Sequence, residues 1–456
     1  MAKAKKKENL TPEERLQAAL VPDWEQPYKV PENWCWVTLD SINQYQSSSI
    51  DPSKHPNDFF ELYSVPSSAD DYPEIAMGNE IGSTKQRVEK GDVLLCKINP
   101  RINRVWKVSQ YTENVLLASS EWIIIRNSKI HSDYLMHCFR TPYFREYMLS
   151  NVSGVGGSLM RAQPKYVKTY PLPLPPLPEQ QRIVDRIESL FVKLDEAKQK
   201  AQDALDSFET RKAAILHKAF TGELTAQWRK EHGVGMESWD KTILKNVCKV
   251  NPKKTDTNGL PDDLEVSFFP MASLSEIYGE ITEPQTRLLK DVKNGFTNFS
   301  EGDVVFAKIT PCMENGKSAI IGKLVNGIGY GTTEFYVLRC SENLYNRYLY
   351  HMVRDTSFRN KAKAVMSGAV GQQRVPKSFM ENYPLNLPSV PEQTEIVRII
   401  DNLLAKEQQA KEAAETVLEQ IDLMKKSILA RAFRGELGTN DPTEESAVEL
   451  LKQLLE

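Results

Sequence analysis

A short stretch in the first half of the chain is dense in basic side chains. Seven lysines and arginines lie between Lys85 and Lys107, against two acidic residues. Basic side chains gathered in this way can neutralise phosphate groups, and an arginine guanidinium can donate two parallel hydrogen bonds to guanine. These chemistries make four of the seven residues candidates for nucleic-acid contact: Lys97, Arg101, Arg104 and Lys107. A solvated basic loop without a ligand is the alternative explanation, and the sequence leaves it open.

A second type of candidate combines glycines with amide and cationic side chains. It occurs twice, as SGVGGSLMRAQPKYVK at residues 153–168 and as SGAVGQQRVPKSF at residues 367–379. Glycines let a backbone approach a ligand closely, a glutamine amide can pair with adenine, and cations can hold phosphate. The candidates are Arg161, Gln163, Lys165, Gln372, Gln373, Arg374 and Lys377. A flexible loop with exposed polar residues would produce the same pattern.

The element that must position these residues is a module that occurs twice. Tyr170–Leu224 matches Tyr383–Leu437 at a constant offset of 213, with 25 of 55 positions identical. Weaker similarity extends backwards, where GDVLLCKINP at Gly91 pairs with GDVVFAKITP at Gly302. A repeat on this scale indicates two like domains. The basic loop of the second copy carries fewer charges, and its candidates are Lys308, Asn315 and Lys317.

Each copy of the module has the same internal order. Runs such as VLLCKI and EWIIIR, rich in β-branched and aromatic residues, predict a mostly β region first. A proline-rich stretch follows, PLPLPPLP from Pro171 and PLNLPSVP from Pro384, and predicts an extended, stiff connector. A long helix then begins near Pro178 or Pro391, because the first turn of a helix tolerates proline.

The apolar spacing of the two helices predicts a coiled coil. Apolar residues recur at alternating intervals of four and three, as they do in the seam between paired helices. The first helix, from Pro178 to His217, would be about 60 Å long. We expect antiparallel pairing, and two independent helices packed on their own sheets are the alternative. Glu407 interrupts the second stripe and is expected to face solvent where the helices splay. The predicted seam comprises Ile183, Ile187, Leu190, Leu194, Phe208, Ile396, Ile400, Leu403, Val417, Ile421 and Ile428.

Composition excludes several classes of protein. The 456 residues are 40% hydrophobic, without an apolar run near the roughly 18 residues that cross a bilayer, so we expect no membrane contact. The basic N-terminus is not followed by an apolar region, which predicts a cytoplasmic protein. A net charge of -3 excludes a uniformly basic nucleic-acid coat but permits local basic patches. The six cysteines form no CxxC pair and are expected to be reduced thiols.

No catalytic set is visible in the sequence. An N-P-P-Y or D-P-P-Y segment for a flipped adenine is absent, and no glycine-rich turn offers an S-adenosylmethionine site. The segment Gly316-Lys317-Ser318 resembles the end of a phosphate-binding loop, but Pro311 stands where that loop needs glycine. His137 and His351 occupy matched repeat positions, where packing on a helix explains them better than metal binding. We therefore expect no catalytic residue, bound cofactor or metal in this chain.

The order of these motifs resembles a known family. A variable β-rich region, then PLPxPPLxEQxxIV, a long helix and an xAFxGEL tail, all occurring twice, are similar to the specificity subunit of type I restriction-modification systems. The resemblance covers nearly the whole chain. It implies an α+β protein with two β-rich target recognition domains at opposite ends of a long antiparallel two-helix coiled coil, related by a pseudo-two-fold repeat.

The resemblance also implies a function. Each target recognition domain would read one half of a bipartite site in double-stranded DNA, while the helices would set the spacer and dock two methyltransferase subunits. Adenine methylation with S-adenosylmethionine, and any cleavage by restriction or translocase subunits, would belong to partners, so the chain would not be catalytic on its own. Recognition domains diverge within the family, so the half-sites cannot be read from the resemblance. A two-headed protein-interaction scaffold with a coiled-coil spacer is the alternative function.

The repeat and the resemblance together divide the chain into six segments. We expect a charged, helical segment at 1–20, the first recognition domain at 21–170, the first proline connector and long helix at 171–232, the second recognition domain at 233–383, the second connector and helix at 384–437, and a helical tail at 438–456.

Overall fold

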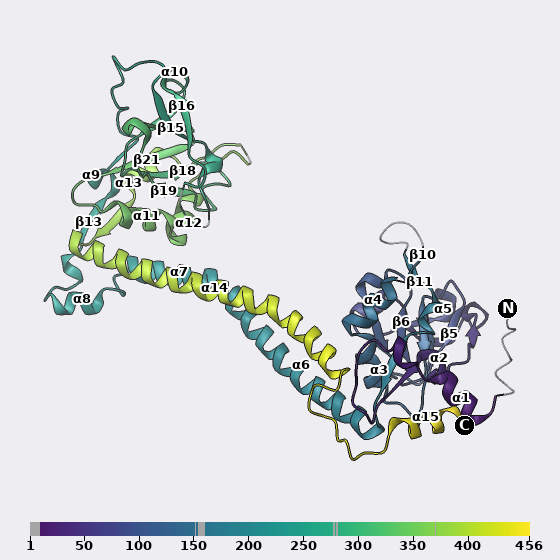
Figure 1. Ribbon diagram of the computed structural model, residues 1–456. Coiled ribbons are helices and arrows are strands. Elements are labelled where there is room, and N and C mark those ends of the chain that lie inside the picture. The colour runs from purple at the N-terminus through teal and green to yellow at the C-terminus, as the bar shows by residue number, and fades with distance from the viewer. Residues whose placement is uncertain (1–9, 151, 154–159, 277–278, 280, 370) are drawn as a thin grey trace. The chain divides into compact units, whose positions relative to one another are not determined.

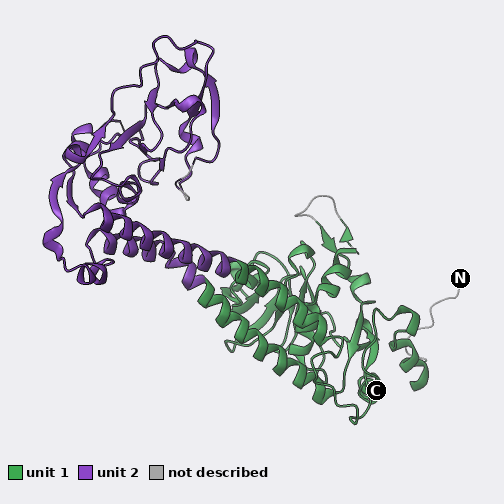
Figure 2. Ribbon diagram, turned by 60° about the vertical axis from the view of Figure 1, so that its left-hand side comes forward, with its two compact units in different colours: residues 1–201, 416–456 green, residues 202–415 purple. Residues whose placement is uncertain are grey.

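The β-rich runs of each repeat copy form small sheets around separate cores. The computed structural model describes residues 10–150, 152–153, 160–276, 279, 281–369 and 371–456. It divides into unit 1, residues 1–201 with 416–456, and unit 2, residues 202–415 (Figure 2). Sheets and helices occur in both units, which makes the protein a two-domain α+β protein, as predicted. In the described ranges, no helix is both long and apolar enough to cross a membrane.

Unit 1 is built on two main sheets (Figure 1). One has the strand order β2-β5-β8-β3-β4, in which β3 and β8 are parallel and the other pairs antiparallel, and the other has the antiparallel order β7-β6-β9. All side chains of β6 are buried, as expected for an apolar run that is covered on both faces. The strands are β1 (Cys35–Thr38), β2 (Ser49–Ile50), β3 (Phe59–Tyr63), β4 (Glu74–Met77), β5 (Lys85–Arg87), β6 (Val93–Cys96), β7 (Val105–Lys107), β8 (Val115–Ala118), β9 (Trp122–Ile125), β10 (Val152–Ser153), β11 (Arg161–Ala162) and β12 (Pro171–Leu174).

Helices cover the sheets of unit 1 and complete its core. The predicted N-terminal helical segment is present as α1, and residues 1–9 lie outside the described ranges. The helix α3 lies against β6 and β7, and α4 lies against the turn η6 (Pro100–Ile102). The last helix, α15, lies against α1 and α2. These helices are α1 (Pro12–Ala19), α2 (Leu39–Ile42), α3 (Ser132–Phe139), α4 (Pro142–Ser150), α5 (Pro164–Val167), α6 (Leu177–Asp206) and α15 (Ala447–Leu455).

Unit 2 has a comparable set of strands. Its sheets have the orders β14-β21-β18-β19 and β16-β15-β20-β17, with β15 and β20 parallel. All side chains of β18, which contains the VVFA run, are buried. The strands are β13 (Asp240–Ile243), β14 (Cys248–Val250), β15 (Glu265–Phe269), β16 (Gln285–Leu288), β17 (Thr297–Phe299), β18 (Val304–Ala307), β19 (Ser318–Ile320), β20 (Gly329–Gly331), β21 (Phe335–Cys340) and β22 (Pro384–Leu387).

The helices of unit 2 follow the same plan. The helix α11 lies against β18 and β19, as α3 does against β6 and β7 in unit 1. The helix α14 contributes its first part to unit 2 and its last part to unit 1. These helices are α7 (Phe208–Phe220), α8 (Ala226–Glu231), α9 (Leu244–Val247), α10 (Leu289–Val292), α11 (Asn346–Arg354), α12 (Thr356–Ala364), α13 (Lys377–Asn382) and α14 (Val390–Ala432).

The proline-rich stretch is extended, as predicted, but in each unit it is a paired strand rather than a free connector. β12 pairs antiparallel with β1, which places Leu174 opposite Cys35, and β22 pairs in the same way with β13. Proline has no backbone N–H, so a strand that contains it is suited to pairing along one edge only. Both of these sheets have only two strands, so each proline-containing strand needs to pair along one edge only.

The first turn of α6 contains a buried carboxylate and a buried amide. Glu179 accepts hydrogen bonds from Nε1 of Trp34 at 2.7 Å and from Nδ2 of Asn440 at 2.8 Å. Gln180 accepts one from the backbone N–H of His131 at 2.9 Å. Both side chains are 0% exposed, and a buried polar group without partners is costly. The Glu-Gln pair therefore joins the start of the long helix to three other segments of unit 1.

The first turn of α14 repeats this arrangement in unit 2. Glu392 accepts hydrogen bonds from Nε1 of Trp239 at 2.9 Å and from Nη1 of Arg229 at 2.6 Å. Gln393 accepts one from the backbone N–H of Tyr345 at 2.8 Å. Here one donor is a buried cation, so unit 2 contains a buried ion pair where unit 1 has a neutral amide.

Within unit 1, α6 runs antiparallel to the last part of α14. Asp195 pairs with Lys425 at 2.6 Å, whereas Arg182, earlier in α6, pairs with Glu444, which follows α14. The helices also share the main core of the unit. Their buried residues in that core are Ile183, Val184, Ile187, Leu429 and Ala432.

Within unit 2, α7 runs antiparallel to the first part of α14. Arg211 Nε pairs with Glu407 Oε2 at 2.7 Å, and the two helices share a core that includes Leu216, Ala219, Ile396, Val397 and Ile400. The prediction that Glu407 faces solvent was wrong, because its carboxylate has a cation opposite it on the neighbouring helix. A charge in the apolar stripe is thus matched rather than exposed.

Two details of the long helices differ from prediction. The first helix is interrupted once, since α6 ends at Asp206 and α7 begins at Phe208. Val417 was predicted at the seam but is 38% exposed, so that assignment was wrong. The covered stripe of α14 instead passes from Ala414 to Ile421 through the half-buried Leu418. Intervals of four and then three keep these residues on one face.

Two free cysteines face each other on neighbouring strands of unit 2. Cys248 of β14 lies opposite Cys340 of β21. The backbone N–H of Ser341 donates to the carbonyl of Val247 at 2.8 Å, which makes the cysteines a non-hydrogen-bonded pair. Side chains approach more closely at such positions. A hydrogen bond with Cys340, together with burial, raises the pKa of Cys248.

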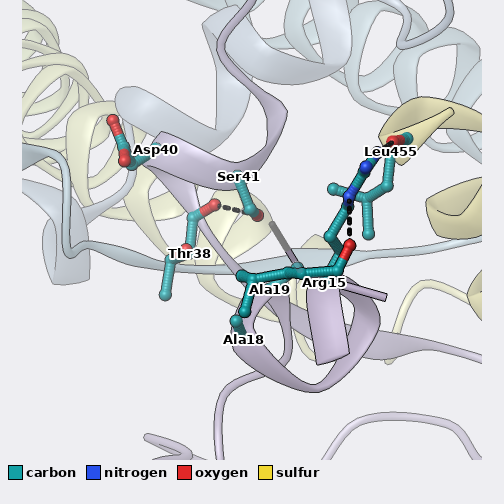
Figure 3. A pocket seen from close by; sticks show the side chains of 8 residues that line it. Arg15, Ala18, Ala19, Thr38, Asp40, Ser41 and Leu455 are labelled. Atoms are coloured by element: carbon teal, nitrogen blue, oxygen red, sulfur yellow. Dashed lines mark hydrogen bonds between the residues drawn. The ribbon is translucent and has the colours of Figure 1, made fainter. Parts of the chain in front are cut away.

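A cavity of about 550 Å³ lies in unit 1 where α1, α2 and α15 meet (Figure 3). Arg15 donates from Nη1 to the carbonyl of Leu455 at 3.4 Å, which joins α1 to α15. The lining includes Asp40 but none of the candidate nucleic-acid contacts. This cavity therefore belongs to the packing of the terminal helices.

Candidate nucleic-acid interface

The structure brings together the two candidate segments of unit 1. The backbone N–H of Ala162 donates to the carbonyl of Lys97 at 2.9 Å, and that of Asn99 donates to the carbonyl of Met160 at 2.9 Å. Arg161 pairs with Ile98 in a β-bridge between these bonds. The basic loop and the segment after the glycines thus form one surface, which the sequence presented as two separate sites. Residues 154–159 of the glycine segment lie outside the described ranges.

Unit 2 repeats this junction at matched positions. The backbone N–H of Val375 donates to the carbonyl of Lys308 at 2.9 Å, and that of Thr310 donates to the carbonyl of Gln373 at 3.0 Å. Arg374 and Ile309 form the corresponding β-bridge. Each unit therefore has one composite candidate surface rather than two.

An arginine–glutamate pair holds each junction. Arg161 lies 3.3 Å from Glu121, and Arg374 makes two hydrogen bonds to Glu334, at 2.9 and 2.8 Å. The hydrogen bond from Arg374 lowers the pKa of Glu334. Both pairs recur at the repeat offset of 213. Since each guanidinium forms an ion pair with a carboxylate of its own unit, Arg161 and Arg374 are suited to holding the junction in place.

Four other predicted contacts also have partners within their unit. Lys107 pairs with Asp133, and Lys377 pairs with Glu381 at 2.9 Å. Nδ2 of Asn315 donates to Glu276 at 3.0 Å, and Nζ of Lys317 lies 3.7 Å from the same carboxylate. The side chain of Lys317 is only 14% exposed. Binding DNA through these groups would require them to exchange or share a partner.

The remaining candidates present polar groups at the surface. Arg101 is exposed on the turn η6, whose flanking Asn99 and Asn103 adopt left-handed backbone angles, with φ of 48° and 51°, and Arg104, directly after Asn103, is half-buried. In the part of the chain that the structure describes, no carboxylate forms an ion pair with either arginine. Of the other candidates in this class, Lys97 and Gln373 are half-buried, Gln372 is exposed, and Gln163 directly precedes α5. Lys165 lies over the ring of Tyr166, and Lys308 lies over the ring of Tyr336.

The sequence reasoning missed two arginines in each unit. Arg145 Nε donates to the carbonyl of Arg101 at 2.9 Å, and Arg140 Nη2 donates to that of Val105 at 3.0 Å. In unit 2, Arg354 Nη1 donates to the carbonyl of Gly316 at 3.0 Å, and Arg359 contacts the same loop. A signal was present, because FRTPYFR at residues 139–145 and VRDTSFR at 353–359 place arginines at matched positions.

The histidines at matched positions pack on helices, as predicted. His137 is buried in α3, and burial lowers its pKa to about 4. His351 in α11 lies 2.9 Å from Asp401, and burial lowers its pKa despite that carboxylate.

Comparison with known proteins places these features in a family. The model of the type I restriction modification DNA specificity domain matches residues 31–205 and 236–420. Over 260 residues the chain is 34% identical to the EcoAI specificity subunit of Escherichia coli, a match that covers 48% of this chain and 44% of that protein. The EcoEI specificity subunit of Escherichia coli is 33% identical, with 48% and 43% covered. The chain thus spans less than half the length of these relatives.

A solved structure shares the fold. The crystal structure of the HsdS subunit from Thermoanaerobacter tengcongensis matches with a TM-score of 0.66 at 21% identity, covering 91% of this chain and 100% of that one. Because two copies of the family's domain model match most of the sequence, this chain belongs to the type I restriction-modification DNA specificity family.

Proposed function

We propose that this chain is the noncatalytic DNA sequence-specificity subunit of a type I restriction-modification complex, with each unit reading one half of a bipartite site. The observation that carries the proposal is the matched junction in both units. The same backbone bonds join Lys97 to Ala162 and Lys308 to Val375, yet the side chains displayed there differ. A common frame with different polar groups suits two recognition surfaces of different sequence preference.

The displayed groups suggest what each unit reads. In unit 1, Arg101 and Arg104 offer guanidinium forks, which match the O6 and N7 acceptors of guanine. In unit 2, Gln372 and Gln373 offer amides, which match the N6 and N7 groups of adenine. Arg161 and Arg374 act in this proposal as positioning residues, because Glu121 and Glu334 hold them.

The long helices have two further roles in the proposal. They form an antiparallel coiled coil that sets the distance between the half-sites, and they dock two methyltransferase subunits, which bind S-adenosylmethionine and carry out adenine methylation. Restriction and translocase subunits are partners of the complete complex. Inserting four residues near Ala201 and four near Ala414 should lengthen the unread spacer by about two base pairs, since each insertion adds about 6 Å. Methylation at the original spacing by a folded, active variant would refute this role.

Methylation mapping tests the function directly. The chain and its methyltransferase partners should together methylate one bipartite motif genome-wide, and the partners alone should not. Arg101→Ala with Arg104→Ala should relax one half-site, at about 1 to 3 kcal/mol, and Gln372→Ala with Gln373→Ala the other. Purified chain that transfers methyl groups by itself would overturn the noncatalytic role. A protein-interaction scaffold would instead show no salt-dependent DNA affinity.

A further inference from the structure

A cavity of about 650 Å³ in unit 1 is lined by five cations. Its lining comes from the turn η6 and the residues after it, the end of α3, the helix α4 and the last part of α14, with two residues of the segment 66–69. Among the described residues that line it, none is a carboxylate. The cations are Arg101, Arg104, Arg140, Arg145 and Lys426.

Hydrogen bonds anchor two of the five cations, although four of the five side chains are exposed. Arg145 and Arg140 each donate one hydrogen bond to a carbonyl of the basic loop, and Nδ2 of Asn103 donates to the carbonyl of Phe139 at 3.0 Å. These bonds fix the loop on α3 and α4. A guanidinium has five N–H donors, so each arginine keeps further donors for a ligand.

The carboxylates that act on the cations of this cavity lie outside its lining. Burial lowers the pKa of Arg140, and Asp71 and Asp133 act in the opposite direction. Asp133 is engaged by Lys107. Like charges that share a cavity repel one another, so binding an anion there relieves an unfavourable arrangement.

Unit 2 has the matched cavity with a smaller excess of positive charge, because five cations there face three carboxylates. A cavity of about 570 Å³ is lined by the corresponding arginines, Arg354 and Arg359. Carboxylates also line it, and they form ion pairs with cations of the same unit. The pairs are Glu209 with Lys212, Glu276 with Lys317 and Asp401 with Arg347. The fold therefore tolerates carboxylates at this place, and the carboxylate-free lining in unit 1 is not required for folding.

We propose that the cationic cavity of unit 1 binds phosphates of the DNA backbone beside the half-site that this unit reads. The inference rests on the proposed function and adds Arg140, Arg145 and Lys426 to it. DNA is the favoured occupant because Arg101 and Arg104, the candidates for base contact, lie on the wall of the same cavity. A duplex read by those side chains passes its backbone close to the other cations. Arginine and lysine in a fixed cavity match phosphate oxygens through charge-assisted hydrogen bonds.

The test uses the full chain assembled with its methyltransferase subunits. Lys426 is the residue to change, because it is exposed and makes no bond that holds the loop among the described residues. Lys426→Gln and Lys426→Glu would be compared with Lys425→Gln, a neighbouring lysine that pairs with Asp195 instead. Affinity would be measured by fluorescence anisotropy over a series of salt concentrations, for a duplex with the methylated motif and for a scrambled duplex.

Loss of one phosphate contact should weaken both duplexes by the same factor, since phosphates carry no sequence information. The slope of log affinity against log salt should fall by about one in Lys426→Gln and by more in Lys426→Glu. Lys425→Gln should bind as the unaltered complex does. The methylated motif should stay the same in all variants.

Three results would overturn the inference. Unchanged affinity and salt slope in both Lys426 variants would show that no phosphate binds there. Loss of methyltransferase assembly, seen by size-exclusion chromatography, would assign the cavity to an acidic segment of the partner protein. Weakening confined to the motif duplex would make Lys426 a base contact. Failure of the unaltered complex to methylate any bipartite motif would instead refute the proposed function itself.

Discussion

The buried carboxylate of Glu392 should tolerate replacement by glutamine much less well than its counterpart in unit 1. Oε1 accepts from Arg229 Nη1 at 2.6 Å and from Thr225 Oγ1 at 2.7 Å, while Oε2 accepts from Trp239 Nε1 at 2.9 Å. A glutamine amide has one acceptor oxygen and one NH₂ donor. Either orientation therefore turns the NH₂ group towards another donor, and the buried guanidinium loses its counterion.

The matched residue Glu179 lacks that cation. Oε2 accepts from Trp34 Nε1 at 2.7 Å and from Asn440 Nδ2 at 2.8 Å, while Oε1 accepts from Thr439 Oγ1 at 3.3 Å. A glutamine here can keep its oxygen towards Trp34 and Asn440, and its NH₂ group can donate to the hydroxyl of Thr439, which can rotate to accept. All three contacts survive, with only the charge removed.

The expected magnitudes differ accordingly. Removing one partner of a buried ion pair costs about 3 to 5 kcal/mol, so Glu392→Gln should lower the free energy of unfolding of unit 2 by that amount. Replacing charge-assisted hydrogen bonds by neutral ones costs about 1 kcal/mol, which is the expected effect of Glu179→Gln on unit 1. The same chemical change is made at the same repeat position in both cases.

Hydrogen exchange followed by mass spectrometry in a urea series measures both values in the full-length chain. Peptides from β13 and α8 report on unit 2, and peptides from β1 and α6 report on unit 1. In each variant the unchanged unit serves as the control. Equal destabilisation of the two units, or a loss below about 1 kcal/mol in Glu392→Gln, would contradict the assigned hydrogen bonds and the role of the buried guanidinium.

Three further predictions concern pH, oxidation and the loop junction. Burial lowers the pKa of His137 to about 4, below that of an imidazole in the unfolded chain. As the pH falls from 6.5 towards 4, the unfolded chain therefore binds a proton that the folded protein does not, and the free energy of unfolding falls by about 3 kcal/mol in all. Urea midpoints should therefore depend less on pH in His137→Leu, and an unchanged pH dependence would refute this. Glutathione disulfide should oxidise Cys248 and Cys340 to an intramolecular disulfide, because opposed strand positions match its geometry, and non-reducing peptide maps without the linked peptide would disprove it. Arg374→Ala and Glu334→Gln should both speed hydrogen exchange in residues 371–375, whereas an effect on DNA binding alone would identify Arg374 as a base contact.

The repeat offset made much of the fold predictable. It identified two like modules and the sequence equivalence of Glu179 with Glu392, because those positions are identical in both copies. It did not reveal why the glutamates recur, since the Trp34 that donates to Glu179 lies 145 residues away. A charge in the first turn of a helix is explained adequately by the helix dipole alone. Only the structure shows that both carboxylates are buried and fully bonded.

Pairing between helices was harder to predict than the helices themselves. Apolar spacing indicates a covered face, but the effect of one polar residue in that face depends on what lies opposite. Glu407 interrupts the apolar stripe in the sequence, but in the structure it forms an ion pair with Arg211 on the neighbouring helix. Val417 satisfied the spacing yet is exposed, because intervals of three and four both keep a helix face, and Leu418, the next residue, lies on the covered face instead.

The candidate surface was predictable by residue type but not by grouping. Local charge density identified Arg101 and Arg104, and the glycine segments identified Gln372 and Gln373. Their junctions depend on backbone bonds between segments more than 60 residues apart, such as the bond from the N–H of Thr310 to the carbonyl of Gln373, two residues with a separation of 63. No local pattern encodes such a bond. The cations of the cavity come from three separate segments of the chain, so the cavity could not be predicted for the same reason.

The two units separate what is fixed from what varies. Groups that hold the framework recur: the buried Glu-Gln pair, the partly exposed arginine–glutamate pair and the arginines that contact the basic loop occupy matched positions in both units. Changes to the buried Glu-Gln pair are expected to cost several kcal/mol, whereas exposed substitutions usually change stability by less than about 0.5 kcal/mol. The displayed side chains at the junctions and the charge balance of the two cavities are the features that differ. Under the proposed function, a protein arranged in this way can acquire a new DNA preference in one unit without losing the stability of either.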